Sequence, residues 1–306
     1  MDKICFSLLF NHRFDRNVPI LRKLYAERFS TLRFLMPFVE WDAEPDVFPV
    51  FETSVHFQGY FAQAYERLPQ DCDYYVFCGD DLILNPSLDE TNLIDSLNCR
   101  DAAYVKYLNP ICEHSFAWHR FEECVFFPPD DCIIPHASLL PTREELLERY
   151  NHHDLPCRNL GPSNFRGAFD KSITWERCKA GLTFILRHGC KPFLPFPLVE
   201  GYSDFIVIPR DEWEKFAYYC GVFAAMNLWV DAAVATAMLL ACDTIRTEVN
   251  HSFSGIELWG DEQLEPEKKY ALNFQSMIED FPAERLYLHP VKLSRWNSTP
   301  NQTHPA

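Results

Sequence analysis

The chain of 306 residues lacks any C-x-x-C pair, although it contains twelve cysteines. Cys5, Cys78 and Cys242 lie inside apolar segments, as small buried hydrophobic residues do. The spacing therefore argues against a disulfide framework and favours reduced thiols. The opening residues MDKICFSLLF also lack the basic region and the small-residue cleavage site of a signal peptide. From these two absences we expect a cytoplasmic protein with free cysteines.

Positive charge is scarce as well. The sequence has 28 lysine and arginine residues against 44 aspartate and glutamate residues, which gives a formal net charge of −16. It contains no long basic run, so it lacks the positive face that a nucleic-acid-binding protein needs. The negative charge also repels anionic lipid surfaces. Phosphate groups can still be bound locally, through a metal ion or a few well-placed cations.

One apolar stretch, residues 218–242, is long enough to span a bilayer. Asn227 and Asp231 lie near its middle, however, and an aspartate at the centre of a membrane helix costs roughly 2.5–3.5 kcal/mol. We therefore expect a buried core helix and no transmembrane segment. The hydrophobic content of 47% is sufficient for a large folded core.

The N-terminal part of the chain alternates short apolar runs with amphipathic segments. Apolar runs at 3–10, 31–39 and 73–79 predict strands, and the spacing of apolar residues predicts helices at 17–29 and 56–68. This alternation predicts an α/β fold with a mostly parallel central sheet flanked by helices. Ligands of such sheets bind at the carboxyl ends of the strands.

The remainder of the chain follows a looser pattern. We expect a helix from residue 143, a helix over 172–190, a strand over 204–209, a helix around Asp231 and a final strand within 285–296. The segment NLGPSNFRGAF, at 159–169, has the glycine content of a mobile loop.

The sequence contains no internal repeat and no clear linker. We therefore expect a single domain over residues 1–296, followed by a flexible tail at 297–306. Within the domain, residues 1–105 and 106–296 would form two functional halves.

Two adjacent aspartates follow the third predicted strand, in the segment YYVFCGDDLILNP at 74–86. Such a pair often forms a turn or caps the next helix. Here Asp80 and Asp81 stand between apolar flanks at the expected ligand-binding edge of the sheet. Two carboxylates held together repel each other unless a cation neutralises them, and an oxygen-coordinated divalent ion does this well.

The order strand, helix, strand, helix, followed by YYVFCGDDLILNP, resembles the nucleotide-binding half of GT-A glycosyltransferases, which have a Rossmann-like fold. The resemblance covers roughly residues 3–90, and Gly79 stands where the fullest acidic motif has its first aspartate. It implies that Asp81 binds Mn²⁺ or Mg²⁺ against the diphosphate of a sugar nucleotide. Asp80 would then contact the metal, a metal-bound water or the ribose.

Transfer of a sugar with inversion needs a base that removes the proton of the acceptor hydroxyl. Asp231 is the leading candidate because it is an acid within an apolar helix, although a helix cap or a buried ion pair would also explain it. Glu200 is the second candidate. By the resemblance, Tyr202 offers a stacking face for an acceptor sugar and Asp204 binds acceptor hydroxyls.

The resemblance also assigns residues around the donor. His289 would complete the metal site, and Lys292 would grip the diphosphate. Further donor contacts are expected from the loop after the first strand and from the start of the second helix, namely Asn11, His12, Arg13, Gln58 and Gly59.

The sequence therefore predicts a metal-dependent glycosyltransferase that uses a nucleoside diphosphate sugar, with a UDP-sugar favoured, and a glycan acceptor. A retaining enzyme could use the same donor site. A non-catalytic carbohydrate- or nucleotide-binding protein of the same fold is an alternative, and a sugar nucleotidyltransferase is another. Viral RNA polymerases also carry Gly-Asp-Asp, but the net charge and the short chain argue against that function.

Overall fold

The structure of the protein is a computed structural model that describes residues 2–40, 44–113, 139–157 and 198–297, together with Trp175, Lys179 and Leu186. The strands of the main sheet are β1 (Ile4–Leu9), β2 (Thr31–Pro37), β3 (Val47–Val50), β4 (Tyr74–Gly79), β6 (Ala103–Val105), β9 (Phe205–Pro209) and β10 (Ile245–Arg246). A second sheet contains β5 (Ile83–Leu84), β11 (Ser254–Glu257) and β12 (Arg285–His289). A third contains β7 (Asn109–Pro110) and β8 (Val199–Glu200). The helices are α1 (Val18–Tyr25), α2 (Phe57–Ala64), α3 (Leu93–Ser96), α5 (Arg143–His152), α7 (Arg210–Ala225), α8 (Val230–Ala241), α9 (Leu264–Lys269) and α10 (Phe274–Glu279).

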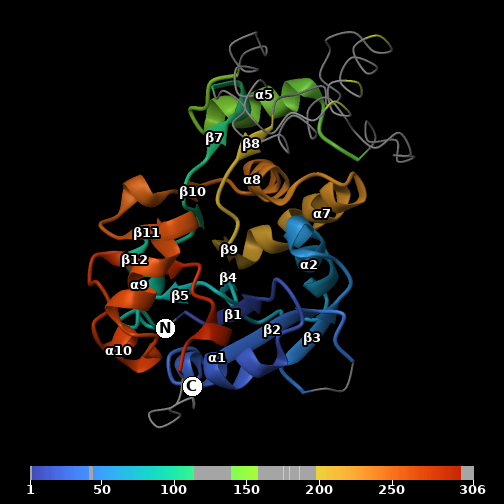
Figure 1. Cartoon of the computed structure of the whole chain (residues 1–306). Coiled ribbons are helices and arrows are strands. Elements are labelled where there is room, and N and C mark those ends of the chain that lie inside the picture. The colour runs from blue at the N-terminus through green and yellow to red at the C-terminus, as the bar shows by residue number, and fades with distance from the viewer. Residues whose placement is uncertain are drawn as a thin grey trace.

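The main sheet has the strand order β10-β6-β9-β4-β1-β2-β3 (Figure 1). Strand β9 runs antiparallel to β4 and β6, and the other neighbours are parallel. The predicted α/β class, a mostly parallel central sheet flanked by helices, is confirmed. The sequence pattern does not predict β3, since Pro49 interrupts it; proline is tolerated there because β3 is an edge strand.

Both faces of the sheet are covered. Strand β1 is buried along its whole length, and its side chains alternate between two apolar clusters. Ile4, Phe6 and Leu8 pack with α1 on one face, and Cys5 and Leu9 belong to the cluster with α2, α7 and α8 on the other. This double burial explains why the strand has an unbroken apolar sequence.

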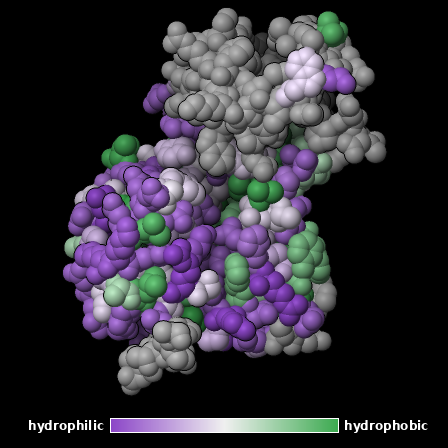
Figure 2. Space-filling view, viewed as in Figure 1, coloured by the Kyte–Doolittle hydropathy of each residue, from purple (hydrophilic) through white to green (hydrophobic). Residues whose placement is uncertain are grey.

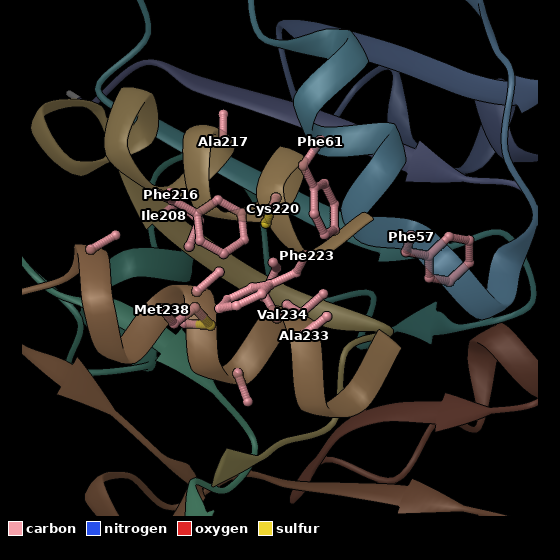
Figure 3. Packing of buried hydrophobic residues seen from close by; sticks show 14 of the residues in the cluster. Phe57, Phe61, Ile208, Phe216, Ala217, Cys220, Phe223, Ala233, Val234 and Met238 are labelled. Carbon is pink, nitrogen blue, oxygen red and sulfur yellow. The ribbon is translucent and has the colours of Figure 1, made fainter. Parts of the chain in front are cut away.

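Aromatic rings fill the core beneath α2, α7 and α8 (Figure 3). The ring of Phe61 in α2 lies 5.5 Å from that of Phe216 in α7 and 4.7 Å from that of Phe77 in β4. Figure 3 shows Phe223 and Met238 directed into the same space. Polar residues dominate the visible surface outside, with scattered apolar ones (Figure 2).

The apolar stretch at 218–242 forms parts of two helices. Helix α7 ends at Ala225, and α8 begins at Val230 after a turn in which Asn227 adopts a left-handed φ of 55°. Among the described residues, no helix is both long and apolar enough to cross a membrane.

Other predicted segments fall partly or wholly outside the described residues. The loop at 159–169 lies outside them, the helix at 172–190 is described at three single positions, and the tail at 297–306 is described at Asn297 alone. The division of residues 1–296 into two functional halves stays a prediction.

The second sheet joins distant parts of the chain. Strand β5 begins two residues after Asp81 and pairs antiparallel with β12, with Leu84 opposite Tyr287 and Ile83 opposite Leu288. The amide of Val291 then donates to the carbonyl oxygen of Asp81, at 2.6 Å. These backbone bonds bring the residues that follow β12 close to Asp80 and Asp81, the acid pair that follows β4.

Two glycines provide a matched test of this packing. A Cβ on Gly255 in β11 would overlap the buried ring of Tyr287 in β12, whereas one on Gly221 in α7 would lie 3.4 Å from Ala62. We expect Gly255→Ala to reduce the free energy of unfolding by about 1–3 kcal/mol. Gly221→Ala should be neutral or stabilise by about 0.5–1 kcal/mol through its helix propensity. Urea denaturation measures the free energy of unfolding of both variants. Equal stability of the two variants would contradict the packing of β11 against β12.

Candidate active site

A cavity of 880 Å³ opens at the carboxyl edge of the main sheet. Its volume lies within the range of about 300–1,000 Å³ that is typical of small-molecule sites. Its lining includes residues of the loop after β1, the turn after β4, the segment from β8 to β9, the start of α8, and the end of β12 with the segment that follows it. Residues at the start of α2, around β7, and at the end of β11 and just after it also contribute. The predicted site residues among them are Asn11, His12, Asp80, Asp81, Glu200, Tyr202, Asp204, Asp231, His289 and Lys292.

Asp80 lies at the inner end of this cavity and is 2% exposed. Its carboxylate accepts hydrogen bonds from the backbone amide of Asn11, at 3.1 Å, and from the side-chain amide of Asn17, at 3.3 Å. Burial and the neighbouring charge of Asp81 raise the pKa of Asp80 to about 7. The hydrogen bonds from the two asparagines lower this pKa, but they offset only part of the increase.

Asp81 is paired with cations. Its Oδ1 lies 3.2 Å from Nε2 of His289, and its Oδ2 accepts a hydrogen bond of 2.6 Å from Nζ of Lys292. Burial by itself would raise the pKa of Asp81, but the hydrogen bond and charge of His289 and the charge of Lys292 lower it to about 2. Asp81 is therefore ionised at neutral pH, and Asp80 holds a proton over part of the neutral range.

The two acids together fit a divalent cation that is shared with a phosphate ligand. The separation of 3.2 Å between Nε2 of His289 and Oδ1 of Asp81 would allow both atoms to reach one ion. Across the part of the chain that the structure describes, no group of three or more His, Cys, Asp or Glu residues is arranged to hold a metal. Ions such as Mg²⁺ commonly take one or two carboxylates and complete their shell with water and substrate phosphate oxygens. The residues thus fit a metal–nucleotide complex better than a free ion.

Asp231 stands in the first turn of α8, on the wall of the same cavity. It does not cap the helix, because the N-cap position is Trp229, and no described residue forms an ion pair with it. Asp231 is partly buried, and it lines the cavity. This burial and the charge of Asp204 raise the pKa of Asp231 to about 8. Hydrogen bonds from Ser203 act in the opposite direction, but their effect is smaller.

Tyr202 is placed differently from what the resemblance implied. Its ring is 7% exposed and stacks on Tyr287, with centroids 5.9 Å apart and planes at 14°. Its hydroxyl lies 2.5 Å from Nδ1 of His289. One face of the Tyr202 ring is therefore covered by Tyr287, while the residue itself lines the cavity, and its contact with an acceptor sugar stays a prediction.

Three predicted donor residues are absent from the cavity wall. Arg13 lies at the surface, 3.2 Å from Asp15, and is half exposed. Gln58 is fully buried and donates to the carbonyl of Leu228 at 2.6 Å, which ties α2 to the turn between α7 and α8. Gly59 packs against the side chain of Glu52.

The structure adds cavity residues that were not singled out from the sequence. Asn17, Trp229 and Trp259 all line the wall, and Trp259 is 57% exposed, with its ring centroid 5.9 Å from that of His289. Asn17 is recognisable only through its position soon after β1. No local sequence pattern marks the tryptophans, because their place depends on contacts between distant segments.

No protein-family model matches this chain, and no curated protein matches its sequence. Among solved structures, the chain is similar to core-mannan synthase A from Aspergillus fumigatus in its Mn/GDP form. The TM-score is 0.29 with 12% identity, over 78% of this chain and 70% of that one. A likeness of this size does not establish a relationship between the two proteins.

The raised pKa of Asp231 predicts a pH-dependent cost in stability. The unfolded chain releases this proton near a pKa of about 3.9, whereas the folded protein holds it until about pH 8. Between these values the folded state binds more protons, so its stability falls as pH rises. We expect Asp231→Asn to stabilise the protein, by an amount that grows from pH 4 to about 2–4 kcal/mol at pH 8.

Thermal unfolding of wild type and Asp231→Asn across this range measures the difference. Asp280→Asn, a change at an exposed position whose pKa is lowered by Lys269, serves as the control and should not reproduce the trend. A constant difference between wild type and Asp231→Asn at all pH values would show that Asp231 ionises normally.

Proposed function

We propose that the protein is a metal-dependent glycosyltransferase, which moves a sugar from a nucleoside diphosphate sugar to a hydroxyl group of an acceptor. The observation that carries the proposal is the content of a single cavity. It holds the acid pair Asp80 and Asp81, the basic side chains of His289 and Lys292, and the isolated acid Asp231. The side chains that would hold a cation-bound diphosphate and the one that would remove a proton therefore face the same cavity, which supports the proposal.

The charge of the cavity favours a diphosphate that arrives with its cation. Asp80, Asp81, Asp204 and Asp231 all line the wall, so a bare diphosphate would be repelled. A divalent ion held by two protein side chains of this cluster, Asp81 and His289, and by phosphate oxygens would neutralise the charge that develops on the departing diphosphate. Asn11 and Asn17 hold the carboxylate of Asp80 in place through their amide groups.

Lys292 supplies a second, movable positive charge. Its side chain is 47% exposed and its ammonium group already contacts Asp81. Because lysine carries its charge on a flexible stem, the ammonium group can turn from Asp81 to a phosphate oxygen when the donor binds. Lys292 would thereby stabilise the leaving group in the transition state.

Asp231 would accept the proton of the acceptor hydroxyl as that oxygen attacks the sugar. A carboxylate is an efficient general base when its pKa lies near the working pH, and the environment of Asp231 raises its pKa to about 8. Single displacement with inversion follows from a base of this kind. Glu200 lines the same wall and is the second candidate for the role.

The first test concerns the donor site. We expect UDP-, GDP- or dTDP-sugars to raise the melting temperature of the wild type in the presence of Mn²⁺, and one of them to be hydrolysed slowly without an acceptor. Asp81→Asn should abolish both effects, because it removes the negative charge that faces His289 and Lys292. Asp280→Asn should leave them unchanged. No response of the wild type to any donor with Mn²⁺ would contradict the proposal.

The second test separates catalysis from donor binding. Asp231→Asn keeps the size of the side chain but cannot accept the proton, so we expect turnover to fall by about 10²–10⁴-fold. The affinity for the Mn²⁺–nucleotide complex should change by no more than about twofold, since among the described residues no hydrogen bond joins Asp231 to Asp80 or Asp81. Turnover is measured by product release, and the affinity is measured by calorimetric titration. Unchanged turnover would move the role of base to Glu200, and donor binding without turnover in the wild type would favour a non-catalytic protein.

A further inference from the structure

One wall of the cavity presents a largely exposed tryptophan. Trp259 follows β11, lines the cavity and is 57% exposed, although burial of an indole ring would remove a large apolar surface from water. Its ring lies 5.9 Å from that of His289, with the two planes at 77°. A ligand that stacks on this indole would therefore stand beside the cluster formed by His289 and Asp81.

The carboxylate of Glu257 belongs to the same wall. Glu257 ends β11, and the backbone of Trp259, two residues later, is also extended. Residues at this spacing in an extended segment direct their side chains to the same side, and both residues line the cavity. Oε1 of Glu257 accepts a hydrogen bond of 2.6 Å from the hydroxyl of Tyr287, and Oε2 accepts one from the ammonium group of Lys106. The carboxylate is thus held in place, and each oxygen keeps a lone pair for a ligand.

The charges around Glu257 favour a neutral ligand. Lys106 is not among the described residues that line the cavity, and its ammonium group is bound to Glu257 and to the carbonyl oxygen of Gly255. Glu200 and Asp204 line the cavity as well, so an anion would meet further acidic side chains. Carboxylates accept hydrogen bonds, and a ligand rich in hydroxyl groups supplies the donors that they need.

We propose that Trp259 and Glu257 bind a neutral sugar of the acceptor, with the face of the sugar ring against the indole and a hydroxyl group donating to the carboxylate. A sugar ring suits this pair, because its C–H groups form an apolar face that packs on the electron-rich face of an indole while its hydroxyl groups point outward. The assignment of this sugar to the acceptor rests on the proposed function, whereas the binding of a sugar does not.

Binding of sugars is measured by NMR titration with the methyl glycosides of glucose, galactose and mannose, and with the uronate of each. We expect the wild type to bind at least one neutral glycoside, and to bind its uronate more weakly by about tenfold or more. Trp259→Ala should weaken the binding by about 10–30-fold, and Trp259→Phe, which keeps a ring, should weaken it less. Trp175→Ala is the control, since Trp175 is 78% exposed and lies outside the cavity lining.

The carboxylate is tested with a second matched pair. Glu257→Gln should reduce the affinity for the neutral glycoside by about 3–10-fold, because an amide oxygen accepts a hydrogen bond less strongly than a carboxylate. Glu248→Gln should leave the affinity unchanged, since Glu248 also faces Lys106, at 3.9 Å, but does not line the cavity. The inference is overturned if no glycoside binds, if uronates bind as tightly as neutral sugars, or if Trp259→Ala behaves like Trp175→Ala.

Turnover then tests the acceptor role, with a bound glycoside as acceptor and the sugar nucleotide that the wild type hydrolyses as donor. We expect Trp259→Ala to raise KM for the glycoside by about 10–30-fold and KM for the donor by less than about twofold. An equal rise in both would overturn the acceptor role. If neutral glycosides bind through Trp259 but no sugar nucleotide is bound with Mn²⁺, the proposed function fails and the sugar site stands. A donor that is bound and hydrolysed by a protein that binds no glycoside gives the opposite result.

Discussion

The burial of two neighbouring carboxylates at the end of β4 is the constraint to which the rest of the site responds. A buried charge without a partner costs several kcal/mol, so each carboxylate needs donors or cations from elsewhere in the fold. Asn11 and Asn17 supply amide donors to Asp80 from the segment between β1 and α1. His289 and Lys292 supply positive charge to Asp81 from beyond β12. The acid pair therefore links the segment that follows β1 to the segment that follows β12.

Gly79 illustrates how crowded the acidic wall is. A Cβ at this position would lie 3.5 Å from Oδ1 of Asp204 and 3.6 Å from Oδ1 of Asp81. Both are ordinary contact distances, so neither backbone conformation nor steric overlap requires glycine here. A polar side chain at position 79 would instead point at two carboxylates. The fold thus accepts several mutually repelling acids in one cavity, an arrangement that lowers stability and is typical of functional sites.

The sequence predicts the main sheet because its signal is local. Strands β1, β2 and β4 are apolar runs, and α1 and α2 carry apolar residues at helical spacing, so each can be recognised from its own residues. Asp81 and Asp231 attract attention for a similar reason, since each is a polar residue beside apolar ones, whereas His289 is indicated by the family resemblance alone. Their partners cannot be found in this way. The stacking of Tyr202 on Tyr287 and the burial of Gln58 against Leu228 depend on contacts between distant segments, about which local periodicity carries no information.

The pairing of β5 with β12 also has a consequence for synthesis on the ribosome. Asp81 and Lys292 are 211 residues apart, so the acid pair leaves the ribosome long before the side chains that compensate it. A nascent chain can form the parallel strands early, but it carries an uncompensated pair of acids until β12 has been made. Incomplete chains therefore lack both the complete cavity wall and the histidine and lysine that pair with Asp81. The cavity can therefore be completed only late in synthesis, when β12 and the residues after it have been added.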